Sequence, residues 1–230
     1  MAVVYLIFTE GHAATHGDAP IRGDLCAEAI RLARLLVRLF PDSSEARGLL
    51  SLLLLTDARR SARLDQEGEI VPLDEQDRSR WDRAKIAEGQ ALLDALMRSG
   101  TLGPYGLQAA IAAVHARAER AEDTAWQEIA TLYAVLARIA PSPVVELNRA
   151  IAIAMVDGAA AALPLLDSLE DGGALSDYRP LYAARADLLR RAGRLRDAAE
   201  SYRRAITLAG NEGERRFLER RLREVTAVER

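Results

Sequence analysis

The stretch that decides the fold is LYAARADLLRRAGRLRDAAESYRRAITLAG, residues 181–210. It contains two helix-forming segments of similar length, separated by a turn at Gly193. Small residues and larger apolar residues recur within it at regular helical spacing: Tyr182, Ala186, Leu189, Ala198, Tyr202 and Ala205. Each small residue marks a point where two helices touch, because a larger side chain would force their backbones apart. The stretch therefore predicts a closely packed helical hairpin.

This spacing is typical of the tetratricopeptide repeat, a helix–turn–helix unit of about 34 residues. The preceding unit fits in part: Ala150 and Ala162 are small, but Leu169 stands where a small residue belongs. The unit before that keeps only Tyr133 and Pro141. Further helices are expected over residues 105–121, 124–140, 142–157, 159–170, 178–192, 195–209 and 211–228. Successive hairpins predict a right-handed α-α superhelix, with a generic helical bundle as the alternative.

Composition supports an all-α protein. Of the 230 residues, 50% are hydrophobic but only 5% are aromatic, and strong helix formers such as Ala, Leu, Arg and Glu dominate. A net charge of −3 argues against a protein whose main role is binding nucleic acid. Cys26 is the only cysteine, so no disulfide can form within the chain. No run reaches the roughly 18 apolar residues of a membrane span, so we expect a cytoplasmic protein without membrane contact.

The first hundred residues are expected to be helical without clear repeats. Residues 1–9 predict a short apolar helix, residues 10–23 a loop, and residues 24–40 a helix capped by Asp24. Asp42 and Glu45 form a capping box before a helix whose run at 49–55 is apolar all round, which predicts a central position. Residues 64–73 interrupt the pattern and predict one short non-helical excursion. Helix then resumes at Asp74 and runs to residue 98, before a break at 99–104.

These patterns divide the chain into an N-terminal helical subdomain, residues 1–100, and a repeat region with a C-terminal capping helix, residues 101–230. We expect the two parts to form one continuous domain.

The first loop holds the residues that most resemble a metal site. His12 and His16 have the i,i+4 spacing of two ligands on one helix face, and Glu10 and Asp18 lie beside them. Gly11 disfavours a helix there, so a solvated loop is the preferred interpretation and no metal site is predicted. The sequence contains no nucleophile elbow, phosphate-binding glycine loop or dinucleotide fingerprint. We therefore expect no catalytic residues, no cofactor and no enzymatic activity.

Two stretches of mixed charge, residues 57–63 and 74–83, flank the interruption at 64–73. One interpretation is a pair of solvated helix faces with weak ion pairs. The other is an arginine–carboxylate network that fixes the loop and presents it to a partner. The candidate interaction surface is Glu10, His12, Arg22, Arg60, Arg63, Asp77, Arg78 and Trp81.

Several longer motifs together resemble a bacterial family. They are Tyr5–Gly11, Asp24–Arg34, Gln76–Trp81, Gly103–Tyr105, Gln108–His115, Pro141–Ala150 and Asn211–Leu218. The chain is similar along its length to RNA polymerase sigma factors of the extracytoplasmic-function type that carry a tetratricopeptide-like C-terminal extension.

The resemblance implies that the chain is the C-terminal domain of such a factor, cut from a longer protein. It implies a regulatory role in transcription initiation, through contacts with sigma regions two and four of the same protein, with RNA polymerase or with another regulatory protein. DNA would be contacted by the absent N-terminal regions only. Two other functions stay open: a sensor that binds a small ligand in the concave groove, and a free-standing scaffold.

Overall fold

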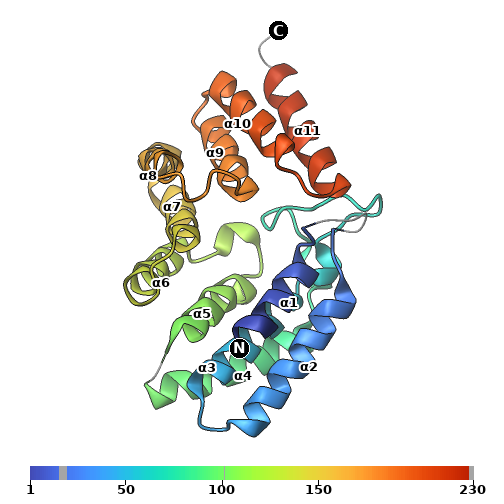
Figure 1. Cartoon of the computed structure of the whole chain (residues 1–230), viewed down its shortest axis with the longest axis vertical. Helices are drawn as coiled ribbons and strands as arrows, with labels where there is room; N and C mark the ends of the chain where they lie inside the picture. Colours follow the sequence, from blue (N-terminus) through green and yellow to red (C-terminus); the bar gives the residue numbers. More distant parts are fainter. Residues whose placement is uncertain (16–19, 101, 228–230) are drawn as a thin grey trace. The chain divides into compact units, whose positions relative to one another are not determined.

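The computed structural model of the chain describes residues 1–15, 20–100 and 102–227 (Figure 1). Residue 101, inside the expected break, and residue 228, the expected last residue of the final helix, lie outside these ranges. The described residues form eleven α-helices and three short 3-10 helices, with one isolated antiparallel bridge, between Leu64 and Ile70. The all-α fold with helical hairpins is therefore confirmed.

The chain divides into two compact units, Met1–Ala125 and Trp126–Arg230, which are described separately. The sequence suggested a boundary at 100/101 instead. The later division has a packing reason, because the helix after residue 101 packs against the central helix of the first unit. That helix therefore belongs with the residues before it.

Five α-helices build the first unit: α1 (Ala2–His12), α2 (Gly23–Leu39), α3 (Ser44–Asp57), α4 (Arg83–Ser99) and α5 (Pro104–Arg117). Helix α3 is central, because α1, α2, α4 and α5 all pack against it. Every residue from Leu49 to Leu55 is buried, as the apolar run predicts.

The start of α3 differs in detail from the predicted capping box. Ser43, not Asp42, is the N-cap, and its hydroxyl accepts a hydrogen bond from Ala46 N at 3.2 Å. Glu45 accepts one from Tyr105 N instead, at 3.3 Å. A carboxylate near the first turn of α5 satisfies an unpaired amide and complements the helix dipole. Glu45 thus connects the beginnings of two helices.

Helix α1 extends through Gly11 to His12, whereas the sequence predicted a loop from residue 10. Gly11 permits a close approach to α2, since a Cβ at this position would lie 2.8 Å from Cys26 N. Helix α2 begins at Gly23, and Asp24 lies in its first turn rather than at the N-cap.

The sequence predicted that the helix resumes at residue 74, but the segment before α4 is not α-helical. The α-helix begins at Arg83, capped by Asp82, whose Oδ1 accepts from Lys85 N at 3.1 Å. Ahead of it lies the short 3-10 helix η2 (Arg78–Arg80), whose N-cap is Asp77. The chain turns here because Arg78 and Trp81 point into the interior, where they are 6% and 3% exposed.

The interruption at residues 64–73 is confirmed as a loop that closes on itself. Its ends are joined by Val71 N donating to Arg63 O at 2.9 Å, beside the bridge between Leu64 and Ile70. The carboxylate of Asp65 accepts from Glu69 N at 2.8 Å, and Gly68 takes a positive φ of 78° at the turn. Only a residue without a Cβ adopts that conformation without strain.

Six helices build the second unit: α6 (Trp126–Ile139), α7 (Pro143–Asp157), α8 (Ala159–Asp171), α9 (Arg179–Arg191), α10 (Leu195–Thr207) and α11 (Glu212–Ala227). Each packs chiefly on the next along the chain, so the unit is a series of helical hairpins. The small positions of the predicted pattern are fully buried: Ala150, Ala162, Ala186, Ala198 and Ala205 are each 0% exposed.

Local sequence sets the helix ends of the second unit. Ser142 caps α7 by accepting from Val145 N at 3.2 Å, with Pro143 in the first turn. Asn211 caps α11 by accepting from Glu214 N at 2.9 Å. Gly193 lies in the turn between α9 and α10. Its φ of 75° falls in the left-handed region that favours glycine.

In the part of the chain that the structure describes, no helix has the length and apolar character required to cross a bilayer.

Candidate functional site

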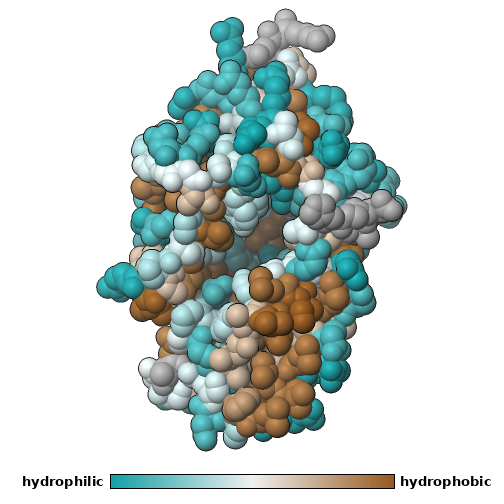
Figure 2. Space-filling view, in the orientation of Figure 1, coloured by the Kyte–Doolittle hydropathy of each residue, from teal (hydrophilic) through white to brown (hydrophobic). Residues whose placement is uncertain are grey.

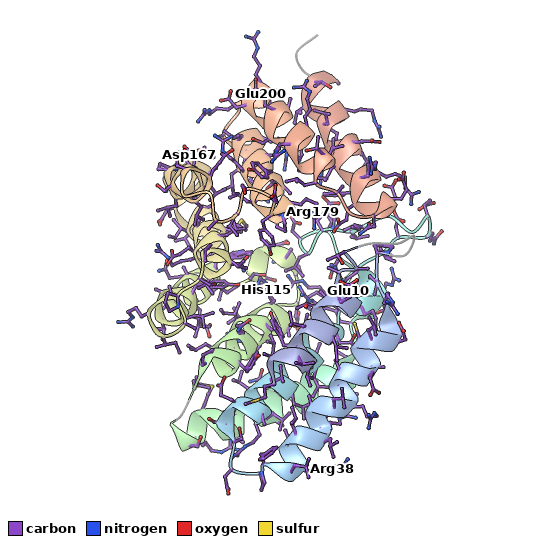
Figure 3. All side chains as sticks on the ribbon, viewed as in Figure 1. Glu10, Arg38, His115, Asp167, Arg179 and Glu200 are labelled. Atoms are coloured by element: carbon purple, nitrogen blue, oxygen red, sulfur yellow. The ribbon has the colours of Figure 1, made fainter. Side chains whose placement is uncertain are left out.

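All eight residues of the candidate interaction surface lie in the first unit. The structure places them in two regions: the end of α3 with the end of α1 and the start of α2, and the turn before α4. Glu10 and His115, which belong to neighbouring parts of this region, are labelled in Figure 3.

Asp57, at the end of α3, is the centre of the first of these regions. Its side chain is 0% exposed, and its Oδ2 accepts from Arg60 Nη2 at 2.9 Å and from Lys85 Nζ at 2.8 Å. Arg60 also donates through Nη1 to Gly23 O at 3.0 Å. A buried carboxylate thus joins the end of α3 to the start of α2 and to α4. Because two cations share it, removal of the carboxylate would cost Arg60 this ion pair and leave Lys85 to Asp82, which lies 3.3 Å away.

His12 occupies the neighbouring position at the end of α1. Its carbonyl accepts a hydrogen bond from Arg63 Nη1, and its ring stacks on Phe8 with centroids 5.6 Å apart. Burial, reinforced by the positive charges of Arg63, Arg59 and Arg60, holds the pKa of His12 well below its ordinary value. The imidazole is therefore neutral at physiological pH, and Arg63 secures the C-terminal end of α1.

Arg78 makes the most complete set of contacts in the turn before α4. Its Nη1 donates to His115 O at 2.7 Å and Ala118 O at 2.9 Å, and its Nη2 donates to Thr124 Oγ1 at 3.2 Å. The guanidinium also lies over the ring of Trp81, 4.8 Å from its centroid. A cation at the C-terminal end of α5 satisfies terminal carbonyls and complements the helix dipole.

These contacts correct one part of the prediction. Arg78 and Trp81 were expected on an interaction surface, yet both are buried. The reason is that the carbonyls at the end of α5 need donors, and the planar guanidinium reaches two of them at once. The alternating charges at 74–83 look like a solvent-facing pattern, and nothing in that spacing reveals the acceptors on a distant helix.

The remaining candidates are paired with close neighbours in the sequence. Arg22 lies 3.4 Å from Asp24, Asp77 accepts from Ser79 N at 2.9 Å, and Glu10 accepts from Thr15 Oγ1 at 2.8 Å. Arg22 and Asp77 are exposed, so they lie on the surface. Arg22 N also donates to Gly11 O at 2.8 Å, and Arg60 binds Gly23 O, so Arg22 lies beside His12 and Arg60. The mixed-charge stretch at 57–63 is a network around Asp57 rather than a solvated face.

His115 and Cys26 are buried groups with displaced pKa values. Burial, with the charges of Arg59 and Arg78, lowers the pKa of His115 to about 3. Burial raises the pKa of the Cys26 thiol to about 11, and Asp57 adds to that effect. Both groups are therefore uncharged at neutral pH, which suits packing rather than nucleophilic or acid–base chemistry.

No group of three or more potential metal ligands is found among residues 1–15, 20–100 and 102–227. His16 and Asp18, two of the four residues weighed as a metal site, lie outside the described residues. The other two, Glu10 and His12, do not converge on a common point, since the Glu10 carboxylate binds Thr15 and the His12 ring stacks on Phe8.

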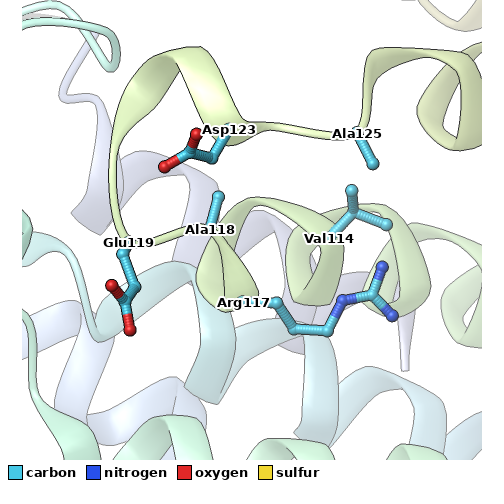
Figure 4. A pocket seen from close by; sticks show the side chains of 6 residues that line it. All are labelled: Val114, Arg117, Ala118, Glu119, Asp123 and Ala125. Carbon is cyan, nitrogen blue, oxygen red and sulfur yellow. The ribbon is translucent and has the colours of Figure 1, made fainter.

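A hollow of about 290 Å³ lies beside the end of α5 (Figure 4). Its lining residues are Val114, Arg117, Ala118, Glu119, Asp123 and Ala125. The side chains of Arg117 and Glu119 point away from each other, and the Asp123 carboxylate is bound by Arg120 at 2.9 Å. In a specific binding site, polar groups converge on the position of the ligand. The polar groups of this hollow do not converge in that way.

The sequence missed a surface formed by α1 and the end of α2. Five large apolar residues are exposed there: Met1 (47%), Val3 (68%), Leu6 (63%), Leu39 (61%) and Phe40 (57%). We call this set the apolar face. Figure 2 shows a continuous hydrophobic area over α1 and the C-terminal part of α2. The available signal was that residues 1–8 are apolar on every side of the helix.

Residues 1–97 match a family of unknown function, DUF6596. Over 225 residues the chain is 47% identical to an uncharacterized protein of Rhizobium meliloti (strain 1021). The alignment covers 98% of this chain and 53% of that protein, so the chain spans about half the length of this relative. No solved structure matches the chain.

The family match has a structural counterpart. Residues 1–97 include α1, α2, α3 and nearly all of α4, so both the Asp57 network and the apolar face fall within it. The acceptors of Arg78 at the end of α5 fall beyond it. The relative, in contrast, is similar to both units.

Proposed function

We propose that this chain is a non-catalytic interaction domain that regulates an alternative sigma factor. It would control transcription initiation through contacts with the sigma regions of the same polypeptide, with RNA polymerase or with a partner protein. The motifs shared with the sigma-factor family support this assignment. So does the fact that the chain spans about half of its relative, because the sigma regions need additional polypeptide.

One structural observation carries the proposal. The buried Asp57 and Arg78, and Arg60 as a partner of Asp57, hold helices together, whereas an apolar face stays exposed on α1 and α2. A domain that acts by contact needs a rigid frame and an uncovered apolar surface. A catalytic site needs converging polar groups with perturbed pKa values around a cavity, and the hollow beside α5 lacks that arrangement.

The first test is genetic. In the polypeptide encoded by the complete reading frame, we expect deletion of this chain to change transcription from the factor's promoters at least severalfold. The polypeptide level should be followed by immunoblot, because loss of the whole protein would mimic loss of regulation. Unchanged transcription at an equal protein level would overturn the proposal.

The second test is binding in vitro. We expect the purified chain to bind the separately produced sigma regions, with titration calorimetry as the readout. If a small metabolite raised the chain's unfolding midpoint while the sigma regions did not bind, the chain would instead be a ligand sensor, because a ligand of the folded state stabilises it.

A further inference from the structure

The apolar face has an unusual position on helix α1. The opposite side of the helix packs in the core, where Phe8 is 2% exposed and lies in one cluster with Cys26 and Ala29. Val3 and Leu6 are three residues apart, which places them on one outward side of the helix. Leu39 and Phe40 are exposed at the end of α2, and Figure 2 shows one hydrophobic area over α1 and the C-terminal part of α2.

A helix that is apolar on all sides normally lies in an interior. In the first unit α1 has an apolar side in the core and another in water. Single exposed apolar residues are ordinary on a protein surface, but a continuous group marks an interaction site. Among the described residues of the first unit, the apolar face is therefore an uncovered surface of the kind that binds another element.

We propose that a helix from the part of the same longer polypeptide outside these residues packs on the apolar face. This proposal rests on the proposed function and names the surface through which the domain contacts the rest of its protein. The chain spans 53% of its relative, so a comparable polypeptide has ample length to provide such a helix.

The size of the apolar face favours a tethered occupant over a second copy of the chain. Stable interfaces between separate proteins use about 20–30 residues from each side. The apolar face has five large side chains. A segment of the same polypeptide acts at an effective concentration of about a millimolar, so a small surface suffices to hold it.

The surroundings define the chemistry of this helix. It would carry apolar residues at three- and four-residue spacing to cover Val3 and Leu6. Arg38 is exposed in the last turn of α2, directly before Leu39 and Phe40 (Figure 3). A carboxylate of the docked helix opposite Arg38 would complement its charge.

Photo-crosslinking tests the occupant. A benzophenone-bearing amino acid is placed at position 6 in the polypeptide encoded by the complete reading frame, and at position 139 as a control. Ile139 is also exposed, at 49%, but lies on α6 in the second unit. We expect position 6 to crosslink within one polypeptide to a peptide outside these residues, and position 139 to give no such product.

Two results would overturn the proposal. One is a crosslink between two copies through position 6, which would make the occupant a second chain. The other is that the complete reading frame encodes no segment beyond these residues, or that position 6 crosslinks to no peptide outside them.

A substitution separates this proposal from the proposed function. Leu6→Glu should leave the unfolding midpoint of the isolated chain unchanged, because Leu6 is 63% exposed. In the complete polypeptide it should speed proteolytic separation of the chain from the remainder about tenfold or more, whereas Ile139→Glu should not. Val3→Glu provides a second variant if Leu6→Glu folds poorly.

The outcomes are distinguishable. If Leu6→Glu and Val3→Glu both leave the proteolysis rate unchanged, the apolar face is not the contact surface, although the regulatory function stands as long as deletion of the chain alters transcription. If the deletion has no effect, the regulatory function fails whatever the crosslinks show.

Discussion

Helices α3 and α5 cross at two glycines: a Cβ added to Gly48 would lie 2.7 Å from the backbone nitrogen of Gly106. Side chains do not approach a backbone atom so closely, so the crossing requires glycine at position 48. The central place of α3 in the first unit depends on this contact, since α5 covers one of its sides.

Gly48→Ala should destabilise the chain. In an isolated helix alanine is favoured over glycine by about 1 kcal/mol. Here we expect the added methyl group to separate two backbones, at an overpacking cost of about 1–3 kcal/mol or more. The net effect is a lower midpoint in urea unfolding followed by circular dichroism.

Gly106→Ala is the matched control for this crossing. Its added methyl group would meet the end of the Leu102 side chain, at 2.9 Å from Cδ2, and that side chain can rotate away. We expect a smaller loss than for Gly48→Ala. Equal losses in the two variants would contradict the idea that backbone contact at position 48 sets the spacing.

Asp57→Asn should lower the free energy of unfolding by about 3–5 kcal/mol, the usual cost of breaking a buried ion pair from one side. The fully buried carboxylate holds Arg60 and Lys85, and an amide cannot balance their charges. Asp82→Asn serves as the control. It removes the other carboxylate paired with Lys85, at 3.3 Å, but Asp82 is half exposed and asparagine caps a helix as well as aspartate. Urea unfolding of both variants at pH 7 decides the point, and a similar small effect of the two would refute the role of Asp57.

Stability should fall in mild acid because of His115. The pKa of His115 is about 3 in the folded chain, against an ordinary value near 6.5. Between these pH values the unfolded chain therefore binds a proton at His115 and the folded chain does not. The stabilisation is complete above pH 6.5 and is lost as the pH falls toward 3. For His115 alone the loss from pH 7 to pH 5 is about 2 kcal/mol.

His12 acts in the same direction, because its pKa is lowered too. His115→Gln should therefore reduce the difference in unfolding free energy between pH 7 and pH 5 without abolishing it. Nuclear magnetic resonance adds an independent check, since the His115 ring signals should not titrate between pH 7 and 5. A pH difference identical to that of the wild type would show that this histidine is not linked to folding.

Cys26 should report on the contact between α1 and α2. The thiol is 0% exposed and its pKa is raised to about 11, so alkylation of the folded chain requires local opening. Gly11→Ala places a methyl group 2.8 Å from Cys26 N and should speed iodoacetamide labelling about tenfold for each 1.4 kcal/mol lost. If the folded wild-type chain were labelled as fast as the urea-unfolded chain, the buried position of Cys26 would be contradicted.

In the second unit, Ala186→Leu should lower the free energy of unfolding by about 1–3 kcal/mol. Ala186 is 0% exposed between helices, so the extra atoms force the hairpin apart. The control is Ala161→Leu, on the exposed side of α8, where the same change should be nearly neutral. The two urea midpoints would coincide if the small residue were not required for packing.

The sequence predicted the second unit well because the small residues there have a single structural use. Ala186, Ala198 and Ala205 can be read as contact points without knowledge of distant residues, and the caps at Ser142 and Asn211 are equally local. The buried run at 49–55 was predictable for a similar reason, since a helix that is apolar on every side normally lies in an interior.

The candidate site depended on partners far away in the sequence, and prediction was weaker there. Arg78 binds carbonyls 37 and 40 residues later, which charge spacing does not reveal. Gly11 looked like a helix breaker, but its missing side chain brings α1 against Cys26. The apolar face was missed because residues 1–9 predicted only a short apolar helix, and which of its sides stays exposed depends on which neighbours are present.

The loop at residues 64–73 has a practical consequence for engineering. Its two ends are fastened to each other through Arg63 and Val71, and the tip at Gln66 and Glu67 is exposed. Because the helices on either side are held by other contacts, new sequence entering at the tip would leave their packing unchanged. A fluorescent or affinity peptide inserted there would mark the first unit while leaving the apolar face on α1 uncovered.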